Sequence, residues 1–323
     1  MAHVVLVTGV SRYLGGRLAQ QLTEDPTVER IIGVDLVPPD AAGAARLGRT
    51  EFVRADIRNP LIAKVFTQAG VQTVVHAAEG ADNLTGTMQL LSACQRSDAV
   101  ERVVVRSTTA VYGSGPGDPA VFTEQMPARA GATSRFTRDA VEIENHVRGF
   151  GRRRPDVAVS ILRLANLIGP SIDTALTRFL SMPVVPTSLG FDPRLQLLHE
   201  SDAVEVLRRA TVEHHPGLFN VAADGALSLT QAIRRAGRLR LPVPARALAL
   251  VGELVRNVGV GQFSAEQSSF LNFGRVVDTT RLRTGFGYQP RYSSAEALRS
   301  YLQDRPPAPR PVAGLLRSLE RAL

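Results

Sequence analysis

The hydrophobic pattern of this chain alternates between two kinds of segment. Short apolar runs rich in β-branched residues predict strands at residues 3–7, 30–34, 50–53, 73–76, 102–105, 157–162 and 217–221. Between the first six, apolar positions recur at helical spacing, as in residues 14–22, 84–95 and 139–150. The strands are continuously apolar, which is typical of a parallel sheet with helices on both faces. The pattern predicts an α/β fold with a doubly wound parallel sheet of the Rossmann type.

A second region begins near residue 168, where prolines at positions 170, 183, 186 and 193 interrupt this rhythm. We expect residues 1–167 to form the sheet domain, rejoined by about 200–222. Residues 168–199 and 223–304 are expected to form a smaller, discontinuous α/β annex, with helices at 241–262 and 293–302. Residues 305–323 form a tail. Its amphipathic end, 315–323, either is disordered, packs as a terminal helix, or contacts a membrane surface or a partner.

The composition disfavours several classes of protein function. The net charge is +8, but the arginines are scattered, and the run at residues 152–154 lies where a helix should end, so a nucleic-acid partner is not expected. No segment approaches the roughly 20 apolar residues of a transmembrane helix. The single cysteine, Cys94, excludes a disulfide framework and a cysteine-rich metal site and favours a cytoplasmic location. Lys64 is the only lysine, so catalytic amines are scarce.

A glycine motif follows the first predicted strand directly. Gly9 permits a tight turn, Gly15 permits close packing of the next helix, and the amides at the helix start suit a pyrophosphate. Asp35 lies at the end of the second strand, where a carboxylate binds the adenosine ribose hydroxyls and repels a 2′-phosphate. These residues predict NAD rather than NADP as the cofactor, the alternative being that Asp35 only caps a loop.

The motif resembles that of the extended short-chain dehydrogenase/reductase family, the nucleotide-sugar epimerases of the UDP-glucose 4-epimerase type and the dehydratases. That family has Thr-Gly-x-x-Gly-x-x-Gly, and here Arg12 replaces the middle glycine, so either the cofactor shifts or the guanidinium adds a contact of its own. The resemblance implies a cofactor site formed by Gly9, Ser11, Arg12, Tyr13, Leu14, Gly15, Asp35, Asp56, Ile57, His76, Ala77, Ala78 and Asn83.

Residues 107–113 are similar to the family's Ser-Ser-x-x-x-Tyr-Gly signature. Thr108, four residues before Tyr112, takes the place of the catalytic hydroxyl, the alternative being a threonine that caps the strand. The 4,6-dehydratases of the family follow this position with Asp-Glu, whereas Thr109 and Ala110 stand here, which disfavours that subclass.

The family's Tyr-x-x-x-Lys pair is missing. Its tyrosine is the general base, and its lysine lowers the phenol pKa and holds the nicotinamide ribose. An alignment on the helix that continues through Glu142 puts Ser134 at the tyrosine position and Arg138 at the lysine position, and a slide of two residues offers Phe136 instead. No register restores the pair.

Other residues are candidates for the missing roles. Arg138 would hold the ribose as a fixed cation, and a substitute base is sought among His76, Glu79 and Glu124. The alternatives are that His76 packs at the strand end and that Glu124 is a solvated loop acid. Glu124 lies in residues 122–127, which look like a family loop beside the substrate pocket.

Three further motifs resemble the family's substrate site. Residues 163–170 match Arg-x-x-Asn-x-x-Gly-Pro, residues 198–203 match His-x-x-Asp-x-Ala, and residues 275–278 match Arg-x-x-Asp. They imply that Asn166, Arg275 and Asp278 bind a nucleotide sugar or another pyrophosphate-linked molecule. Two functions stay open: an NAD-dependent epimerase-type enzyme with an unconventional or weakened base, or a non-catalytic NAD-dependent sensor or scaffold. A homodimer through the helices after residues 84 and 139 is expected in either case.

Overall fold

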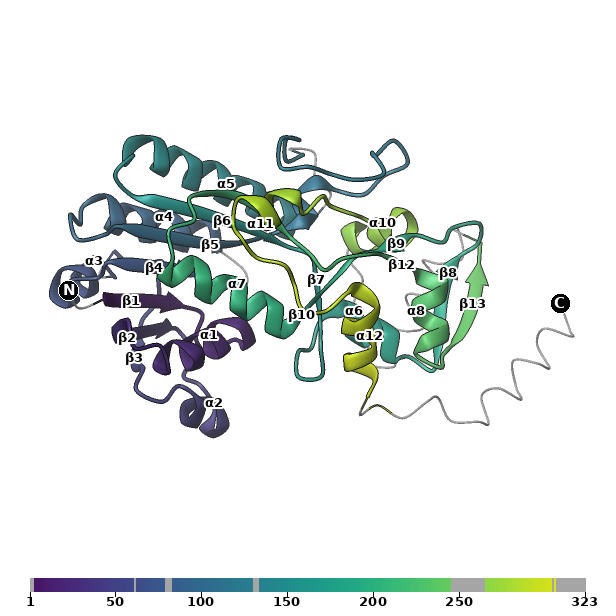
Figure 1. Cartoon of the computed structure of the whole chain (residues 1–323), viewed down its shortest axis with the longest axis horizontal. Helices are drawn as coiled ribbons and strands as arrows, with labels where there is room; N and C mark the ends of the chain where they lie inside the picture. Colours follow the sequence, from purple (N-terminus) through teal and green to yellow (C-terminus); the bar gives the residue numbers. More distant parts are fainter. Residues whose placement is uncertain are drawn as a thin grey trace, which may run out of the picture.

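The computed structural model describes residues 3–60, 62–78, 83–129, 134–244, 265–303 and 305. Its largest feature is a parallel seven-stranded sheet, which confirms the predicted fold class (Figure 1). The strands lie in the order β11 (Gly217–Val221), β6 (Ala158–Leu164), β5 (Arg102–Thr108), β4 (Thr73–His76), β1 (His3–Thr8), β2 (Val28–Asp35) and β3 (Glu51–Arg54). The order reverses beside β1, and ligands of doubly wound folds bind at such a switch point, outside the carboxyl ends of the strands.

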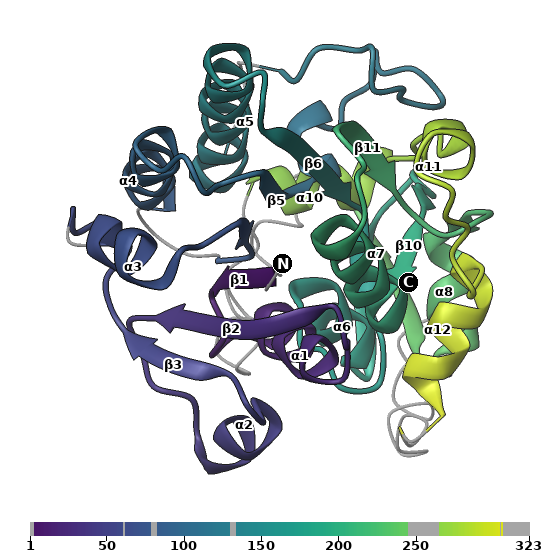
Figure 2. The same cartoon turned by 60° about the vertical axis from the view of Figure 1, so that its left-hand side comes forward.

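Helices cover both faces of this sheet, as the continuously apolar strands predicted (Figure 2). One face carries α3 (Ile62–Ala69), α4 (Asn83–Gln95) and α5 (Arg135–Arg153), and the other carries α1 (Tyr13–Thr23) and α7 (Glu200–Val212). Alternate residues of β1 separate the two cores: Val5 and Val7 pack toward α1 and α7, whereas Leu6 packs toward α3 and α4. The short helices α2 (Ala41–Arg46) and α11 (Thr280–Thr284) complete this half.

A smaller group of elements lies beyond the carboxyl ends of the strands (Figure 1). It contains three two-stranded sheets: β10 (Leu197–His199) with β7 (Asn166–Ile168), β12 (Leu227–Ser228) with β9 (Arg194–Leu195), and β13 (Leu239–Val243) with β8 (Val184–Ser188). The helices α6 (Ala175–Ser181), α8 (Leu229–Arg235), α10 (Ala265–Phe273) and α12 (Ser294–Leu302) belong to the same group. A third apolar core, which includes Phe179, Leu195, Ile233, Phe270 and Tyr301, holds them together.

The predicted helix at 293–302 is confirmed as α12, but the one at 241–262 is wrong where the structure describes it. Residues 241–243 belong to β13, which pairs with β8 in parallel. Pro242 lacks the amide that a helix needs, and an edge strand tolerates a proline. Residues 245–262 and the amphipathic tail, 315–323, lie outside the described residues.

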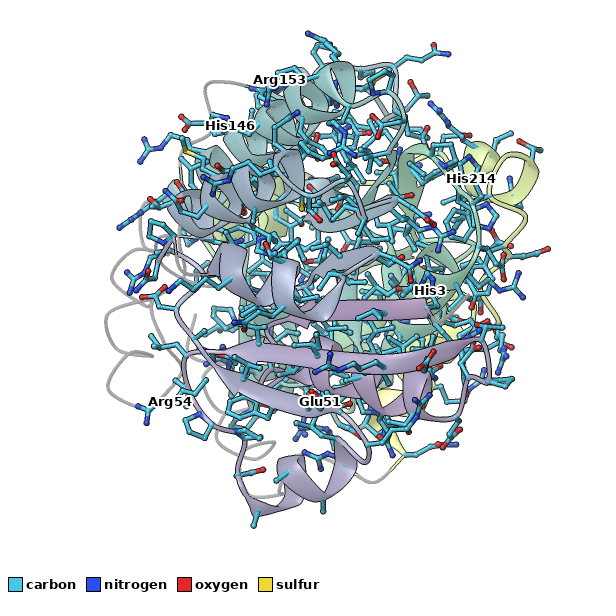
Figure 3. The ribbon with its side chains drawn as sticks, turned by 90° about the vertical axis from the view of Figure 1, so that its left-hand side faces the viewer. His3, Glu51, Arg54, His146, Arg153 and His214 are labelled. Atoms are coloured by element: carbon cyan, nitrogen blue, oxygen red, sulfur yellow. The ribbon has the colours of Figure 1, made fainter. Side chains whose placement is uncertain are left out.

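The arginine run at 152–154 lies at the end of α5, as predicted, and Figure 3 shows Arg153 at the surface there. In the part of the chain that the structure describes, no helix combines the length and the apolar character needed to cross a bilayer.

Candidate cofactor and substrate site

Three neighbouring cavities line the carboxyl ends of the central strands. The Asp35 cavity, of about 300 Å³, is lined by Thr8, Gly9, Arg12, Val34, Asp35, Leu36, Val37, Ala55, Asp56, Ile57, Arg58, Ala78 and Asn83. The Thr108 cavity, of about 260 Å³, is lined by Ala78, Asn83, Arg106, Ser107, Thr108, Arg135, Phe136, Asp139, Ala140 and Ile143. The annex cavity, of about 820 Å³, lies between the large sheet and α6 and α10, and Arg12, Arg106, Thr108, Phe136, Asn166 and Arg275 are among its lining residues. Shared residues join the three into one continuous site.

The loop between β1 and α1 requires glycine at two of its positions. Gly9 has φ +75°, and a Cβ there would lie 2.7 Å from the Cα of Ala78. A Cβ on Gly15 would lie 2.7 Å from the carbonyl carbon of Gly9, so both positions require glycine. Arg12, by contrast, has an extended backbone with φ −93° at the N-cap of α1, which any residue adopts. The loss of the middle glycine therefore costs no backbone strain, and the Arg12 side chain lines both the Asp35 and the annex cavities.

The Asp35 carboxylate lies where the sequence predicted it, at the end of β2 and half-buried in its cavity. Its oxygens accept hydrogen bonds from the Ser11 amide at 3.1 Å and the Val37 amide at 3.3 Å, so it also ties the glycine loop to β2. Each oxygen keeps a further lone pair for a ribose hydroxyl. Asp56 and Ile57 line the same cavity, but the Asp56 carboxylate is paired with Arg58 at 2.6 Å, and that hydrogen-bonded guanidinium lowers its pKa.

His76 lies inside the protein rather than at the ligand. Its Nδ1 is 2.8 Å from the Thr8 hydroxyl, its Nε2 is 2.9 Å from the Thr87 hydroxyl, and the residue is 1% exposed. Burial, with a smaller contribution from the Arg106 charge, lowers the pKa of His76 to about 4. The ring is thus neutral and occupied at both nitrogens, which corrects its expected roles as a cofactor contact and as a substitute base.

This histidine makes stability depend on pH. Because the folded pKa of about 4 lies below the unfolded value of 6.5, the unfolded state takes up a proton first as the pH falls. Stability is complete above about pH 6.5 and falls by roughly 3 kcal/mol by about pH 4. Urea unfolding at pH 7 and pH 4.5 tests this: the loss should shrink in His76→Gln, and an equal loss in both proteins would contradict the assignment.

Thr108 ends β5 and begins the short 3-10 helix η1 (Thr109–Tyr112), where its hydroxyl accepts a hydrogen bond from the Ala110 amide at 3.2 Å. It is a capping threonine, as the alternative interpretation stated, and it also lines both the Thr108 cavity and the annex cavity. The hydroxyl hydrogen stays available to a ligand because capping uses only an oxygen lone pair.

A buried ionic network holds this strand end in place. Ser107 donates a hydrogen bond to Glu144 of α5 at 2.6 Å, and Arg163 of β6 binds the same carboxylate through two hydrogen bonds of 2.8 and 2.6 Å. Arg163 is fully buried and lies 4.6 Å from the ring centroid of Tyr112. Tyr112 donates to Asn220 at 2.8 Å, which extends the network to β11. A bidentate pair of this kind fixes the relative position of β5, β6 and α5.

The face of α5 that lines the Thr108 cavity carries Phe136, Asp139, Ala140 and Ile143. This i, i+3, i+4, i+7 spacing marks one side of a helix. Ser134 lies before the first turn as the N-cap, where its Oγ accepts from the Thr137 amide at 3.2 Å, and Arg138 is exposed on another side of the helix. Neither lines these cavities, which corrects the expected positions of Ser134 and Arg138 and favours the alignment shifted by two residues. Phe136 and Ala140 form an i, i+4 pair on this wall of the cavity, and Arg135 and Asp139 form another beside it.

Glu124, a proposed substitute base, does not face the cavities either. Glu124 accepts a hydrogen bond from the Asn220 amide at 2.8 Å, so it fastens its loop to β11 instead of lining the annex cavity. Glu79 lies outside the described residues. The surroundings of two tyrosines near the site favour the protonated phenol: burial, reinforced by Glu200, raises the pKa of Tyr13, and burial raises that of Tyr112.

Two of the three predicted substrate residues line the annex cavity. Asn166 begins β7 there, and Arg275 reaches it from the segment after α10. Arg275 is nearly buried and donates to the Gly113 carbonyl at 2.8 Å and to the Ser114 hydroxyl at 3.1 Å, so it also braces the loop after η1. Asp278 does not line the cavity. Its carboxylate accepts from the amide and hydroxyl of Thr280 at the start of α11, which corrects its expected role.

Arg106 was not predicted as a site residue. It lies two positions before Thr108 on β5, and side chains two apart on a strand share a face. It lines both the Thr108 and the annex cavities. A charged residue inside the apolar run of residues 102–108 was the signal that could have identified it.

A model of the NAD dependent epimerase/dehydratase family matches residues 5–222. The chain belongs to the NAD-dependent epimerase/dehydratase family. Among relatives of this family member, an uncharacterized protein of Mycobacterium tuberculosis is 49% identical over 315 residues, which span 94% of this chain and 84% of the relative. A probable UDP-arabinose 4-epimerase of Oryza sativa is 28% identical over 188 residues, 51% of this chain and 45% of that protein.

Solved structures share the fold of this family member. The dTDP-glucose 4,6-dehydratase of Bacillus anthracis, in complex with NAD, has a TM-score of 0.73 and 17% identity, covering 94% of this chain and 96% of that chain. The UDP-glucose 4-epimerase of Thermotoga maritima, with UDP-glucose, has a TM-score of 0.72 and 17% identity, with 93% and 97% covered. At this identity the likeness establishes the fold alone.

Proposed function

We propose that this chain binds NAD and a nucleotide sugar and carries out epimerase-type hydride transfer with a weakened acid–base step. The observation that carries the proposal is that Thr108 shares one continuous site with Asp35, Asn166 and Arg275, while α5 presents Phe136 in place of a phenol. Several residues that the resemblance assigns to ligands line this site, whereas α5 turns a phenylalanine rather than a tyrosine toward it, and this combination supports the proposal.

The residues around the Asp35 cavity fit NAD. The Asp35 carboxylate suits two ribose hydroxyls, and Gly9 and Arg12, which precede α1, line the same cavity, so the first amides of α1 suit a pyrophosphate. Arg12 lies where a guanidinium fork can add a bidentate phosphate contact. Ser11, Tyr13, Leu14, Ala77, Ala78 and Asn83 complete the proposed wall. The chemistry that NAD supplies in this family is reversible hydride acceptance.

The protein side of the reaction would rest on Thr108 and Asp139. The Thr108 hydroxyl can donate to the oxygen of a sugar in the annex cavity, which orients the carbon that bears the hydride. Asp139 is the acidic residue among those that line the Thr108 cavity, and it lies 3.6 Å from Arg135. A carboxylate can take a proton but is a weaker base than a phenolate. We therefore expect slow turnover.

Thr108→Ala should lower the conversion of a UDP- or dTDP-sugar by about 10²-fold, because one positioned donor is lost. One sample of the purified protein is denatured, and the small molecules it releases are identified by mass spectrometry. Sugar conversion by the native protein is followed by chromatography in a second sample. Ser134→Ala is the control: it removes a hydroxyl that caps α5 and should leave the rate unchanged. A rate indifferent to Thr108→Ala would refute this role of the hydroxyl.

A non-catalytic NAD-dependent sensor or scaffold is the second candidate. The observation that favours it is the apolar pair Phe136 and Ala140 on the wall of the Thr108 cavity. Released NAD together with unchanged sugars would support this function, and light scattering with and without NAD would then test whether occupancy changes self-association. The homodimer through α4 and α5 remains a prediction that the same measurement tests.

A further inference from the structure

The wall of the Thr108 cavity opposite α5 carries a cation. Arg106 and Thr108 lie two residues apart on β5, so their side chains leave the strand on the same face. Arg106 lines the Thr108 cavity together with Ala78 and Asn83, and it lines the annex cavity together with Arg12. Ala78 and Asn83 also border the Asp35 cavity. Arg106 therefore lies along the path that continues from the Asp35 carboxylate to the Thr108 hydroxyl.

The α5 wall of this cavity offers no amine. The position that faces the cavity one turn after Phe136 is Ala140, and the only lysine of the sequence, Lys64, is on α3. Besides Arg106, the cationic side chain lining the cavity in the described part of the chain is Arg135. Its side chain is 64% exposed, and it lies 3.6 Å from Asp139. Arg135 is thus at the solvent side, where an ionic contact is screened.

The charge of Arg106 acts deep in the site. It contributes to the low pKa of His76, the buried residue at the end of β4, which is the strand beside β5. Since His76 is neutral at physiological pH, it does not repel the guanidinium. A half-buried guanidinium makes stronger hydrogen bonds to oxygen acceptors than an exposed one, because less water competes.

We propose that Arg106 is the cation that binds the nicotinamide-side ribose of NAD, so that the charge which the family supplies from α5 comes here from β5. The inference rests on the proposed binding of NAD. A guanidinium donates several hydrogen bonds in a fixed plane and, unlike an amine, keeps its proton. Arg106 would hold the ribose without taking part in proton transfer. This agrees with a protein that keeps the NAD site but lacks the family's tyrosine.

The test uses three ligands of increasing length, ADP, ADP-ribose and NAD, measured by isothermal titration calorimetry. ADP ends before the second ribose, and ADP-ribose includes it. Arg106→Gln should weaken ADP-ribose and NAD by about 10- to 100-fold, as expected for lost hydrogen bonds from a charged group, and should leave ADP within about twofold. Arg106→Lys should recover part of the loss. Arg135→Ala, which removes the other arginine of the same cavity, should change none of the three affinities.

Each other outcome has a distinct meaning. If Arg106→Gln binds all three ligands like the wild type, or weakens ADP as much as NAD, Arg106 is not the ribose contact and the inference is wrong, while the proposed function stands. If the wild type binds none of the ligands, the proposed NAD site itself fails, and this inference fails with it. Thermal unfolding of Arg106→Gln and Arg106→Lys shows that the compared proteins are folded.

Discussion

Phe136→Tyr combined with Ala140→Lys should raise the rate of nucleotide-sugar conversion by about 10²–10⁴-fold, the usual contribution of a positioned general base. Both positions line the Thr108 cavity on one face of α5, one turn apart. The new lysine would lower the pKa of the new phenol, because a nearby positive charge favours the phenolate. Phe136 is 52% exposed, so a hydroxyl is added without burial of an unpaired group. Initial rates of sugar conversion with saturating NAD measure the gain.

The matched control is Ser134→Tyr combined with Arg138→Lys, which installs the same pair in the other register. Ser134 is the N-cap of α5, and Arg138 is exposed away from the cavity, so this variant should gain nothing. It should also lose about 1 kcal/mol of stability with the cap. Phe136→Tyr alone should give a smaller gain than the double variant, since the lysine one turn away, which further lowers the phenol pKa, is then missing.

These variants decide between the two alignments. If the rate rises in Ser134→Tyr with Arg138→Lys and does not rise in Phe136→Tyr with Ala140→Lys, the face of α5 has been assigned wrongly. If neither pair gives activity although NAD and a nucleotide sugar still bind, the protein lacks more than its base, and the sensor or scaffold function gains support.

Glu144→Ala should destabilise the protein by about 3–5 kcal/mol, because it leaves a buried charge without its partner. Arg163 is 0% exposed and Glu144 is 1% exposed, and two hydrogen bonds join them. The Nη1 atom of Arg163 has no hydrogen-bond acceptor, so the guanidinium depends on this carboxylate for its compensation. Urea unfolding monitored by circular dichroism gives the free energy of unfolding.

Two further variants separate the buried pair from its surroundings. Arg148→Ala removes the outer partner of Glu144. Because the Arg148 side chain is 43% exposed, this change should lower the free energy of unfolding by less than about 1 kcal/mol. Glu144→Leu with Arg163→Met removes both charges and should recover most of the stability lost in Glu144→Ala. A double variant less stable than Glu144→Ala would mean that Ser107 and Tyr112, rather than the ion pair, dominate the network.

The glycine loop and Asp35 lie where local rules put them, whereas Ser134 and Arg138 lie away from the cavities. Gly9, Gly15 and Asp35 follow from the turn, the helix packing and the end of β2, which are determined by neighbours in the sequence. Ser134 and Arg138 were placed by motif spacing across residues 114–134, and the described residues 114–129 form no helix that would fix this spacing. Only the position of α5 against β5 shows that Phe136 and Ala140, and neither Ser134 nor Arg138, line the cavity.

Distant contacts also changed the roles of polar residues that motifs had marked. His76 and Glu124 lie close to the site motifs in the sequence, but two of their partners, Thr8 and the Asn220 amide, lie 68 and 96 residues away along the chain. The tertiary structure likewise places Arg106 in the site, because the segment after β4, the end of β5 and α5 together line the cavity around it.

The sequence by itself determined the sheet, the parallel order of its units, the nucleotide loop and the absence of the phenol–amine pair, because periodicity, glycine geometry and composition are local properties. The tertiary structure decided which side chains face the ligand. A change of two residues along α5 rotates the helix face by about 200°, and the packing of Glu144 against Ser107 and Arg163 selects the face that carries Phe136 and Ala140.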